Sequence, residues 1–151
     1  MDSDFETKLP PYKRDTILIV DDQAVHRTIL NMQFSEKYKI IEAESGREAI
    51  EQIRKNNECL AVILLDVVMS DMLGFEVLKV VKRENLIEEI PVIFVTIEDN
   101  PSTEIQGMAL GVCDIITKPF GPDIVMRRVE NVINLFRYKH CIKKLLADKF
   151  I

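Results

Sequence analysis

Short apolar segments alternate with amphipathic segments of helical length along most of the chain. Four apolar segments are rich in Val, Ile and Leu and end in polar residues, and residues 38–43 form a weaker fifth; the four are residues 16–21, 60–66, 91–96 and 112–118. Nearly continuous aliphatic segments of this length are typical of strands buried on both faces, as in a parallel sheet. We therefore expect five short strands.

The segments between these strands favour helices. Residues 23–37 place Ile29, Leu30 and Phe34 on one side of a predicted helix. The next helix, residues 45–56, begins with Ser45 and carries Glu48 three residues later, which is the pattern of a capping box.

Two further helices are predicted over residues 74–85 and 102–110, and Gly111 is expected to end the second of them in a left-handed cap. Strand and helix thus alternate five times. This alternation predicts an α/β fold in which an open parallel sheet has helices on both faces and right-handed crossovers.

The last segment, residues 122–150, contains no Pro or Gly after its first position and predicts one long helix. One apolar stripe is expected to dock on the sheet: Val125, Val129, Val132 and Phe136. A second stripe drifts away from the first and is left without a partner: Leu135, Tyr138, Ile142 and Leu145.

Polar residues gather where the predicted strands end. Asp21 and Asp22 follow the first apolar segment, Asp66 the third, Thr96 the fourth and Lys118 the fifth. The carboxyl ends of parallel strands meet at one edge of the sheet, which is where such folds bind ligands. Three neighbouring carboxylates repel one another and call for a hard cation such as Mg²⁺. A nucleophilic carboxylate, a lysine and a hydroxyl in one place suit phosphoryl transfer.

The composition narrows the function classes. The chain has 151 residues, a net charge of −5 and no basic stripe, which argues against direct binding of nucleic acid. No apolar segment is long enough to span a membrane, and no secretory signal is visible. The three cysteines show no metal-binding spacing, so we expect reduced thiols in a cytoplasmic protein: Cys59, Cys113 and Cys141.

Several segments together resemble the receiver domain of two-component response regulators. They read Ile-Leu-Ile-Val-Asp-Asp (17–22), Leu-Leu-Asp (64–66), Gly-Phe-Glu-Val-Leu (74–78), Pro-Val-Ile-Phe-Val-Thr (91–96) and Thr-Lys-Pro-Phe (117–120). The resemblance covers about residues 16–137. It implies a flavodoxin-like, doubly wound sheet of five parallel strands in the order 2-1-3-4-5.

The resemblance also implies roles for residues at the strand ends. Asp66 would accept a phosphoryl group from a phosphohistidine on a sensor kinase or phosphotransfer protein. Thr96 and Lys118 would contact that group, and the Lys118-Pro119 bond would be cis. The domain would be a signalling switch that only assists its own phosphorylation and dephosphorylation.

A Mg²⁺ site is implied at the same place. Asp22 would bind the ion directly and Asp21 would bind it through water. Asp66 would belong to the same ligand set, and the main-chain carbonyl of Val68 would supply a further ligand.

Three positions depart from the family pattern. Ile115 stands where an aromatic switch residue is usual, Ser70 stands where a proline is common, and Ile97 replaces a residue that is often small. Ile115 and Ser70 leave open an alternative, a phosphorylation-independent receiver that acts as an interaction scaffold. An aspartyl phosphatase is disfavoured because Val68 occupies the place of its second acid, and a flavin-binding protein is disfavoured because no Gly/Ser/Thr-rich loop follows the first strand.

The expected organisation has three parts. Residues 1–15 are a disordered tail, residues 16–137 the receiver, and residues 138–151 an extension of the last helix. Such an extension is typical of regulators whose outputs are cyclic-dinucleotide enzymes, so we expect a homodimer through this helix or a C-terminal output domain of that class. His26 and His140 are expected to have surface or packing roles.

Overall fold

The computed structural model describes residues 12–97 and 101–150. The strands are β1 (Thr16–Val20), β2 (Lys39–Ala43), β3 (Leu60–Leu65), β4 (Val92–Thr96) and β5 (Asp114–Thr117). The helices are α2 (Ala24–Phe34), α3 (Gly46–Asn56), α4 (Gly74–Arg83), α5 (Pro101–Ala109) and α6 (Pro122–Phe150). Every predicted strand and helix is confirmed, with ends that differ by a few residues.

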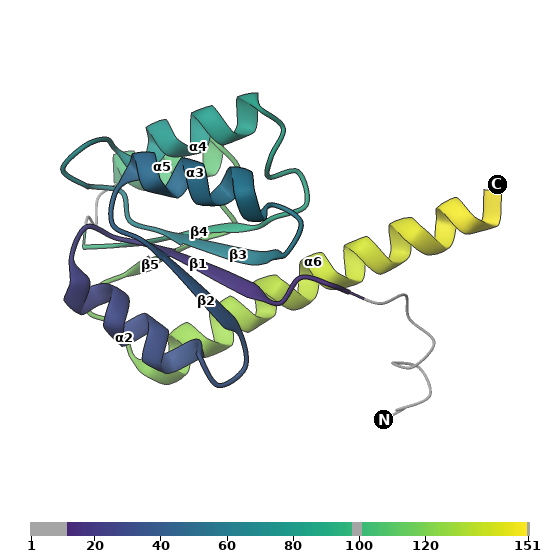
Figure 1. Cartoon of the computed structure of the whole chain (residues 1–151), viewed down its shortest axis with the longest axis horizontal. Helices are drawn as coiled ribbons and strands as arrows, with labels where there is room; N and C mark the ends of the chain where they lie inside the picture. Colours follow the sequence, from purple (N-terminus) through teal and green to yellow (C-terminus); the bar gives the residue numbers. More distant parts are fainter. Residues whose placement is uncertain (1–11, 98–100, 151) are drawn as a thin grey trace.

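The strands form one sheet in the order β2-β1-β3-β4-β5, and each neighbouring pair is parallel. This confirms the predicted doubly wound topology. Helices α2 and α6 lie on one face of the sheet, and α3, α4 and α5 lie on the other (Figure 1). Since all strands run the same way, the residues that follow them share one edge of the sheet.

The alternation of side chains along β1 explains why its apolar segment is continuous. Ile17 and Ile19 point to the face covered by α2 and α6, where they join a buried cluster with Phe34. Leu18 and Val20 point to the opposite face and join the cluster that α3 and α4 complete. Successive residues of a strand face opposite sides, so a strand with helices on both sides needs apolar residues at every position.

The cap of α3 follows the prediction only in part. The Ser45 hydroxyl accepts a hydrogen bond from the Glu48 backbone N–H, as a capping serine does. The Glu48 carboxylate, however, accepts from the backbone N–H of Glu44 and not from that of Ser45. Gly111 ends α5 with φ of 87°, which confirms the predicted left-handed cap.

Two predictions of helix faces were right only in part. Leu30 and Phe34 of α2 are buried, but Ile29 is 49% exposed because it lies about 100° around the helix from Leu30. In α6 the fully docked residues are Val125, Val129 and Ile133, at four-residue steps. Val132 and Phe136, predicted for this stripe, are only partly buried.

The start of the described chain packs against α6. The Tyr12 ring lies 5.6 Å from the His140 ring, and the Arg137 guanidinium lies 6.0 Å from the Tyr12 centroid. Cys141 is buried, so the helix still contacts the rest of the domain one turn beyond Arg137. The second stripe is exposed, as predicted, and Leu146 extends it: Leu135, Tyr138, Ile142, Leu145 and Leu146.

Of the predicted disordered tail, residues 1–11 lie outside the described residues. Residues 12–15 belong to no helix or strand, yet Arg14 donates hydrogen bonds to the carbonyl oxygens of Asn57 and Leu60 and pairs with Glu89. Among the described helices, none combines the length and the apolar character that a membrane span needs.

Candidate functional site

Four strand ends bring the predicted polar residues to one edge of the sheet. Asp21 follows β1, Asp66 follows β3, Thr96 is the last residue of β4, and Lys118 follows β5. The Lys118 N–H donates to the Thr96 carbonyl oxygen at 2.8 Å, which ties the last two together. The Lys118-Pro119 bond is cis, as predicted.

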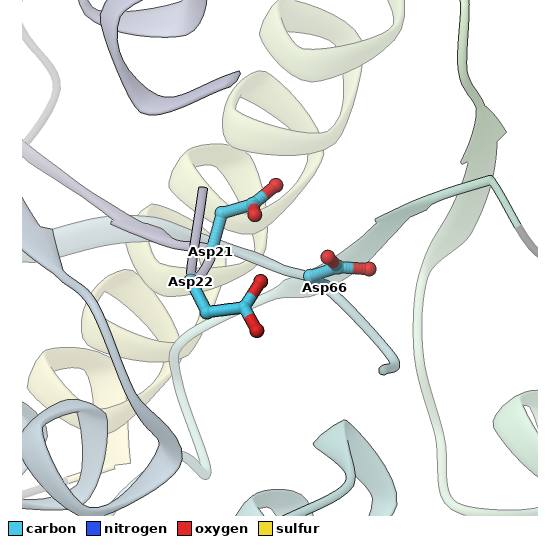
Figure 2. Close-up of side chains that lie close together, drawn as sticks. All are labelled: Asp21, Asp22 and Asp66. Atoms are coloured by element: carbon cyan, nitrogen blue, oxygen red, sulfur yellow. The ribbon is translucent and has the colours of Figure 1, made fainter. Parts of the chain in front are cut away.

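Three carboxylates form the centre of this edge. One oxygen each from Asp21, Asp22 and Asp66 lies within 4.8 Å of the others. Figure 2 shows the three side chains close together at the ends of two neighbouring strands. Asp21 is 2% exposed and Asp66 is 8% exposed, so their mutual repulsion is poorly screened by water. A cluster of carboxylate oxygens is the donor set that Mg²⁺ prefers, and the residues present therefore fit this ion.

Backbone hydrogen bonds orient two of these carboxylates. The Gln23 N–H donates to Asp21 Oδ1 at 2.9 Å, in the turn between β1 and α2. The Ser70 N–H donates to Asp22 Oδ2 at 3.1 Å from the loop between β3 and α4. The second bond links the loop after Asp66 to the acidic pair after β1.

Lys118 supplies the positive charge of the site. Its Nζ lies 2.5 Å from Asp21 Oδ2 and 3.6 Å from Asp66 Oδ2, and its side chain is only 7% exposed. A buried lysine is stable as an ammonium ion only beside compensating negative charge. The pairing with Asp21 provides that charge.

The environment of Asp66 contains groups that raise the pKa of its carboxyl and groups that lower it. Burial raises the pKa of the Asp66 carboxyl above its ordinary value, and the Asp21 carboxylate raises it further. Lys118 and the backbone N–H groups of Val67 and Val68 lower this pKa. A bound cation would add to the lowering, because it favours the ionised carboxylate.

The loop from Asp66 to α4 is anchored on both sides. A Cβ atom at Gly74 would lie 2.5 Å from the Asp66 carbonyl oxygen, so only glycine allows α4 to begin so close to the end of β3. The Asp71 carboxylate accepts hydrogen bonds from the backbone N–H groups of Gly46 and Arg47, at 2.9 and 3.0 Å. Asp71 thus fastens the loop that contains Ser70 to the first turn of α3.

The remaining predicted residues lie on the loops and strands that lead to this centre. Val68 and Ile97 are 49% and 68% exposed. Thr96 is buried. Ile115 lies within β5 opposite Phe94 of β4 and packs against the buried cluster on the α3–α4 face. The roles predicted for these residues stay predictions.

Sequence reasoning missed one residue of the site. His26, expected on the surface or in packing, places its Nδ1 2.9 Å from Lys118 Nζ and 3.2 Å from Asp21 Oδ2. Its place in the first turn of a helix that directly follows β1 puts His26 near the site, but the sequence does not show which side of that helix faces the end of the strand.

A groove borders the site on the side of α2. Its volume is about 370 Å³, and Lys118 and His26 lie in its wall. Its other lining residues are apolar: Val25, Ile29, Leu30, Ile97, Pro119 and Phe120.

Comparison with known proteins gives one family. The family model for the response regulator receiver domain matches residues 17–130. A probable cyclic di-GMP phosphodiesterase of Vibrio cholerae is 33% identical over 135 residues, which are 89% of this chain but 30% of that protein. A chemotaxis protein CheY homologue of Campylobacter jejuni is 33% identical over 119 residues, 78% of this chain and 91% of the homologue.

Among solved structures, chemotaxis protein CheY4 of Vibrio cholerae superposes with a TM-score of 0.73 at 29% identity. The match covers 79% of this chain and 98% of that one. Sequence and fold comparisons therefore agree.

Proposed function

The chain belongs to the response regulator receiver family, and from that premise we propose that Asp66 accepts a phosphoryl group from a phosphohistidine in a Mg²⁺-dependent reaction. The observation that carries the proposal is the gathering of three carboxylates within 4.8 Å, with a buried lysine paired to one of them and near a second. Receivers are signalling domains. The reaction would therefore serve to change the conformation of the domain and not to turn over a substrate.

In the proposed transfer, a carboxylate oxygen of Asp66 attacks the phosphorus atom. A P–O bond forms as the P–N bond of the phosphohistidine breaks, and the departing imidazole nitrogen keeps the electron pair. Asp21, Asp22 and Asp66 would hold Mg²⁺, with the Val68 carbonyl as a further ligand. The ion would supply positive charge against the carboxylates and the phosphoryl oxygens.

Lys118 and Thr96 complete the proposed site. The Lys118 ammonium lies 3.6 Å from Asp66, so a short movement would bring it onto a phosphoryl oxygen. Thr96 would contribute its hydroxyl as a second donor, and its carbonyl already fixes the Lys118 backbone. Both residues would leave their resting positions on phosphorylation and carry the change into the segments that follow β4 and β5.

The groove beside α2 supports a helical histidine kinase or phosphotransfer protein as the donor. A donor must approach Asp66 from outside the strand ends, where Val25, Ile29 and Ile97 expose apolar surface next to Lys118. Apolar side chains around a polar centre are what a protein partner buries on docking.

The extension of α6 supports an output beyond the receiver. We place the receiver at residues 16–137 and the signalling extension at residues 138–151. The exposed stripe suits pairing with a second copy of the helix, and the phosphodiesterase relative, of which this chain spans 30%, suggests an output of the cyclic-dinucleotide class. The scaffold alternative rests on Ile115 and Ser70 alone, and the described residues add no observation in its favour.

The proposal is tested by labelling with acetyl phosphate and Mg²⁺. The wild-type chain should gain one hydroxylamine-labile phosphoryl group, and Asp66→Asn should gain none. Asp71→Asn, the same change at a nearby carboxylate outside the cluster, is the matched control and should be labelled. Labelling of Asp66→Asn at the wild-type level, or labelling that persists when the metal is chelated, would contradict the proposal.

A further inference from the structure

His26 lies where it can act on the lysine of the site. It is in the first turn of α2, with its side chain 28% exposed, and its Nδ1 is 2.9 Å from Lys118 Nζ. The same Nδ1 is 3.2 Å from Asp21 Oδ2, the oxygen that binds Lys118. His26, Asp21 and Lys118 therefore form a compact triangle of polar atoms.

The chemistry of the triangle fixes the role of each atom. An ammonium group carries three donors and no acceptor, so beside Lys118 we assign His26 Nδ1 as the acceptor and the ring proton to Nε2. The 3.2 Å approach of Nδ1 to Asp21 Oδ2 is then a contact between two acceptors that share the Lys118 ammonium, and not a hydrogen bond. With 7% of its side chain exposed, Lys118 has few water molecules to accept its hydrogen bonds. The Nδ1 acceptor takes the place of such a water, which matters because an unmet donor is costly when buried.

The positions of the acceptors decide where Lys118 rests. Asp21 and His26 both lie within 2.9 Å of Nζ, whereas the nearer oxygen of Asp66 is 3.6 Å away. Two short hydrogen bonds hold the ammonium toward Asp21 and away from the carboxylate that accepts the phosphoryl group.

We propose that His26 is a positioning residue that holds Lys118 on Asp21 in the unphosphorylated state. The inference rests on the proposed function. It adds that the hydrogen bond from Lys118 to His26 is broken when Lys118 moves to the phosphoryl group. His26 therefore opposes the switch, because it stabilises only the resting arrangement.

Three substitutions separate this role from simple packing. His26→Asn puts an amide oxygen close to the position of Nδ1 and so keeps the acceptor. His26→Gln moves the acceptor outward, toward the position of Nε2, and His26→Leu keeps the bulk without an acceptor. His140→Leu, the same change at the other histidine of the chain, is the matched control.

The first measurement is the affinity for beryllofluoride with Mg²⁺. His26→Leu and His26→Gln should bind about tenfold more tightly than the wild type, the size expected for one hydrogen bond to a charged group. His26→Asn and His140→Leu should match the wild type. In a Lys118→Ala background the His26 variants should be equal. Unchanged or weaker binding by His26→Leu, or identical behaviour of His26→Asn and His26→Leu, would overturn the proposal.

The second measurement needs no phosphoryl chemistry. Solvent exchange of the Lys118 ammonium protons, observed by ¹⁵N NMR and assigned with Lys118→Ala, should be slow in the wild type and in His26→Asn. It should be about tenfold faster in His26→Leu, for the same loss of one hydrogen bond to a charged group. Equal exchange rates in all three would refute the role of His26. Failure of the wild type to bind beryllofluoride would instead refute the proposed function.

Discussion

Lys118 and Asp21 are 97 positions apart in the sequence, yet their side chains form an ion pair of 2.5 Å. The pair joins the end of β5 to the end of β1 across the carboxyl edge of the sheet. Because Lys118 neutralises an oxygen of Asp21 in the resting state, its removal leaves the carboxylates more negative and does not remove any oxygen that Mg²⁺ would use.

The Lys118→Ala variant should therefore keep or gain affinity for Mg²⁺ and should still be labelled at Asp66, but should lose the conformational response. Hydrogen exchange of α5 and α6 with and without beryllofluoride measures that response. The wild type should show changed protection and the variant none. An equal response in both proteins would show that Lys118 does not couple phosphorylation to structure.

The lifetime of the phosphorylated state is the second prediction. Val68 and Ile97 are apolar and exposed beside the site, so they offer an attacking water no hydrogen-bond partner. We expect dephosphorylation nearer hours than seconds, and we expect Val68→Asn to be faster because its amide can bind that water. The loss of label after removal of the donor measures both rates. Decay of the wild type within seconds, or no effect of Val68→Asn, would contradict this explanation.

The third prediction concerns the anchor between Asp71 and α3. Asp71→Ala removes the acceptor for the Gly46 and Arg47 N–H groups and should lower the free energy of unfolding by about 1 kcal/mol, as for loss of a helix cap. Urea denaturation of the variant and the wild type at neutral pH measures the difference. Glu76→Ala, a change at an exposed acid in the first turn of α4, is the control and should lower the free energy of unfolding by less.

The effect of Asp71 should depend on pH. Partial burial raises the pKa of Asp71, but the backbone N–H groups of Gly46, Arg47 and Met72 together lower it below its ordinary value. A carboxyl with a lowered folded-state pKa stabilises the fold above its unfolded pKa, about 3.9, and loses that contribution as the pH falls through the folded pKa. The free energies of unfolding of the wild type and of Asp71→Ala should therefore converge in strong acid. A difference that is constant from neutral to acidic pH would exclude the carboxylate as the cause.

The fourth prediction concerns self-association through α6. Ile142→Lys and Leu145→Lys place charge on the exposed stripe and should abolish a dimer that beryllofluoride strengthens, as measured by sedimentation. A truncation after Arg137 is a less selective test, because it also removes His140 and the buried Cys141. Lys143→Ala, at an exposed position outside the stripe, is the control and should associate like the wild type. Equal association of all variants, with and without beryllofluoride, would show that α6 acts only as a linker and does not mediate dimerisation.

Much of the fold and of the site centre could be predicted because both depend on local patterns. A strand with helices on both sides needs a continuous apolar segment, and β1 and β3 have one. In a parallel sheet the next polar residues then fall at one edge, and this rule is enough to bring Asp21, Asp66 and Lys118 together from the sequence alone.

The features that escaped prediction depend on how separate elements meet. Which side of α2 faces β1 decides that Leu30 is buried, Ile29 is exposed and His26 reaches Lys118. The hydrogen bond that the Gly46 N–H donates to Asp71 joins segments 25 positions apart, whose distance is set by the packing of α3 against α4. No periodicity within a single segment contains this information.

The length of α6 separates the carboxyl edge of the sheet from the C-terminal end of the helix. The helix begins just after Lys118-Pro119, crosses the face of the sheet and ends well beyond the opposite edge (Figure 1). At 1.5 Å per residue its 29 residues span about 43 Å. Anything attached at its far end would be kept clear of the carboxyl edge, so a phosphoryl donor and an output could be bound at the same time without competing for the same surface.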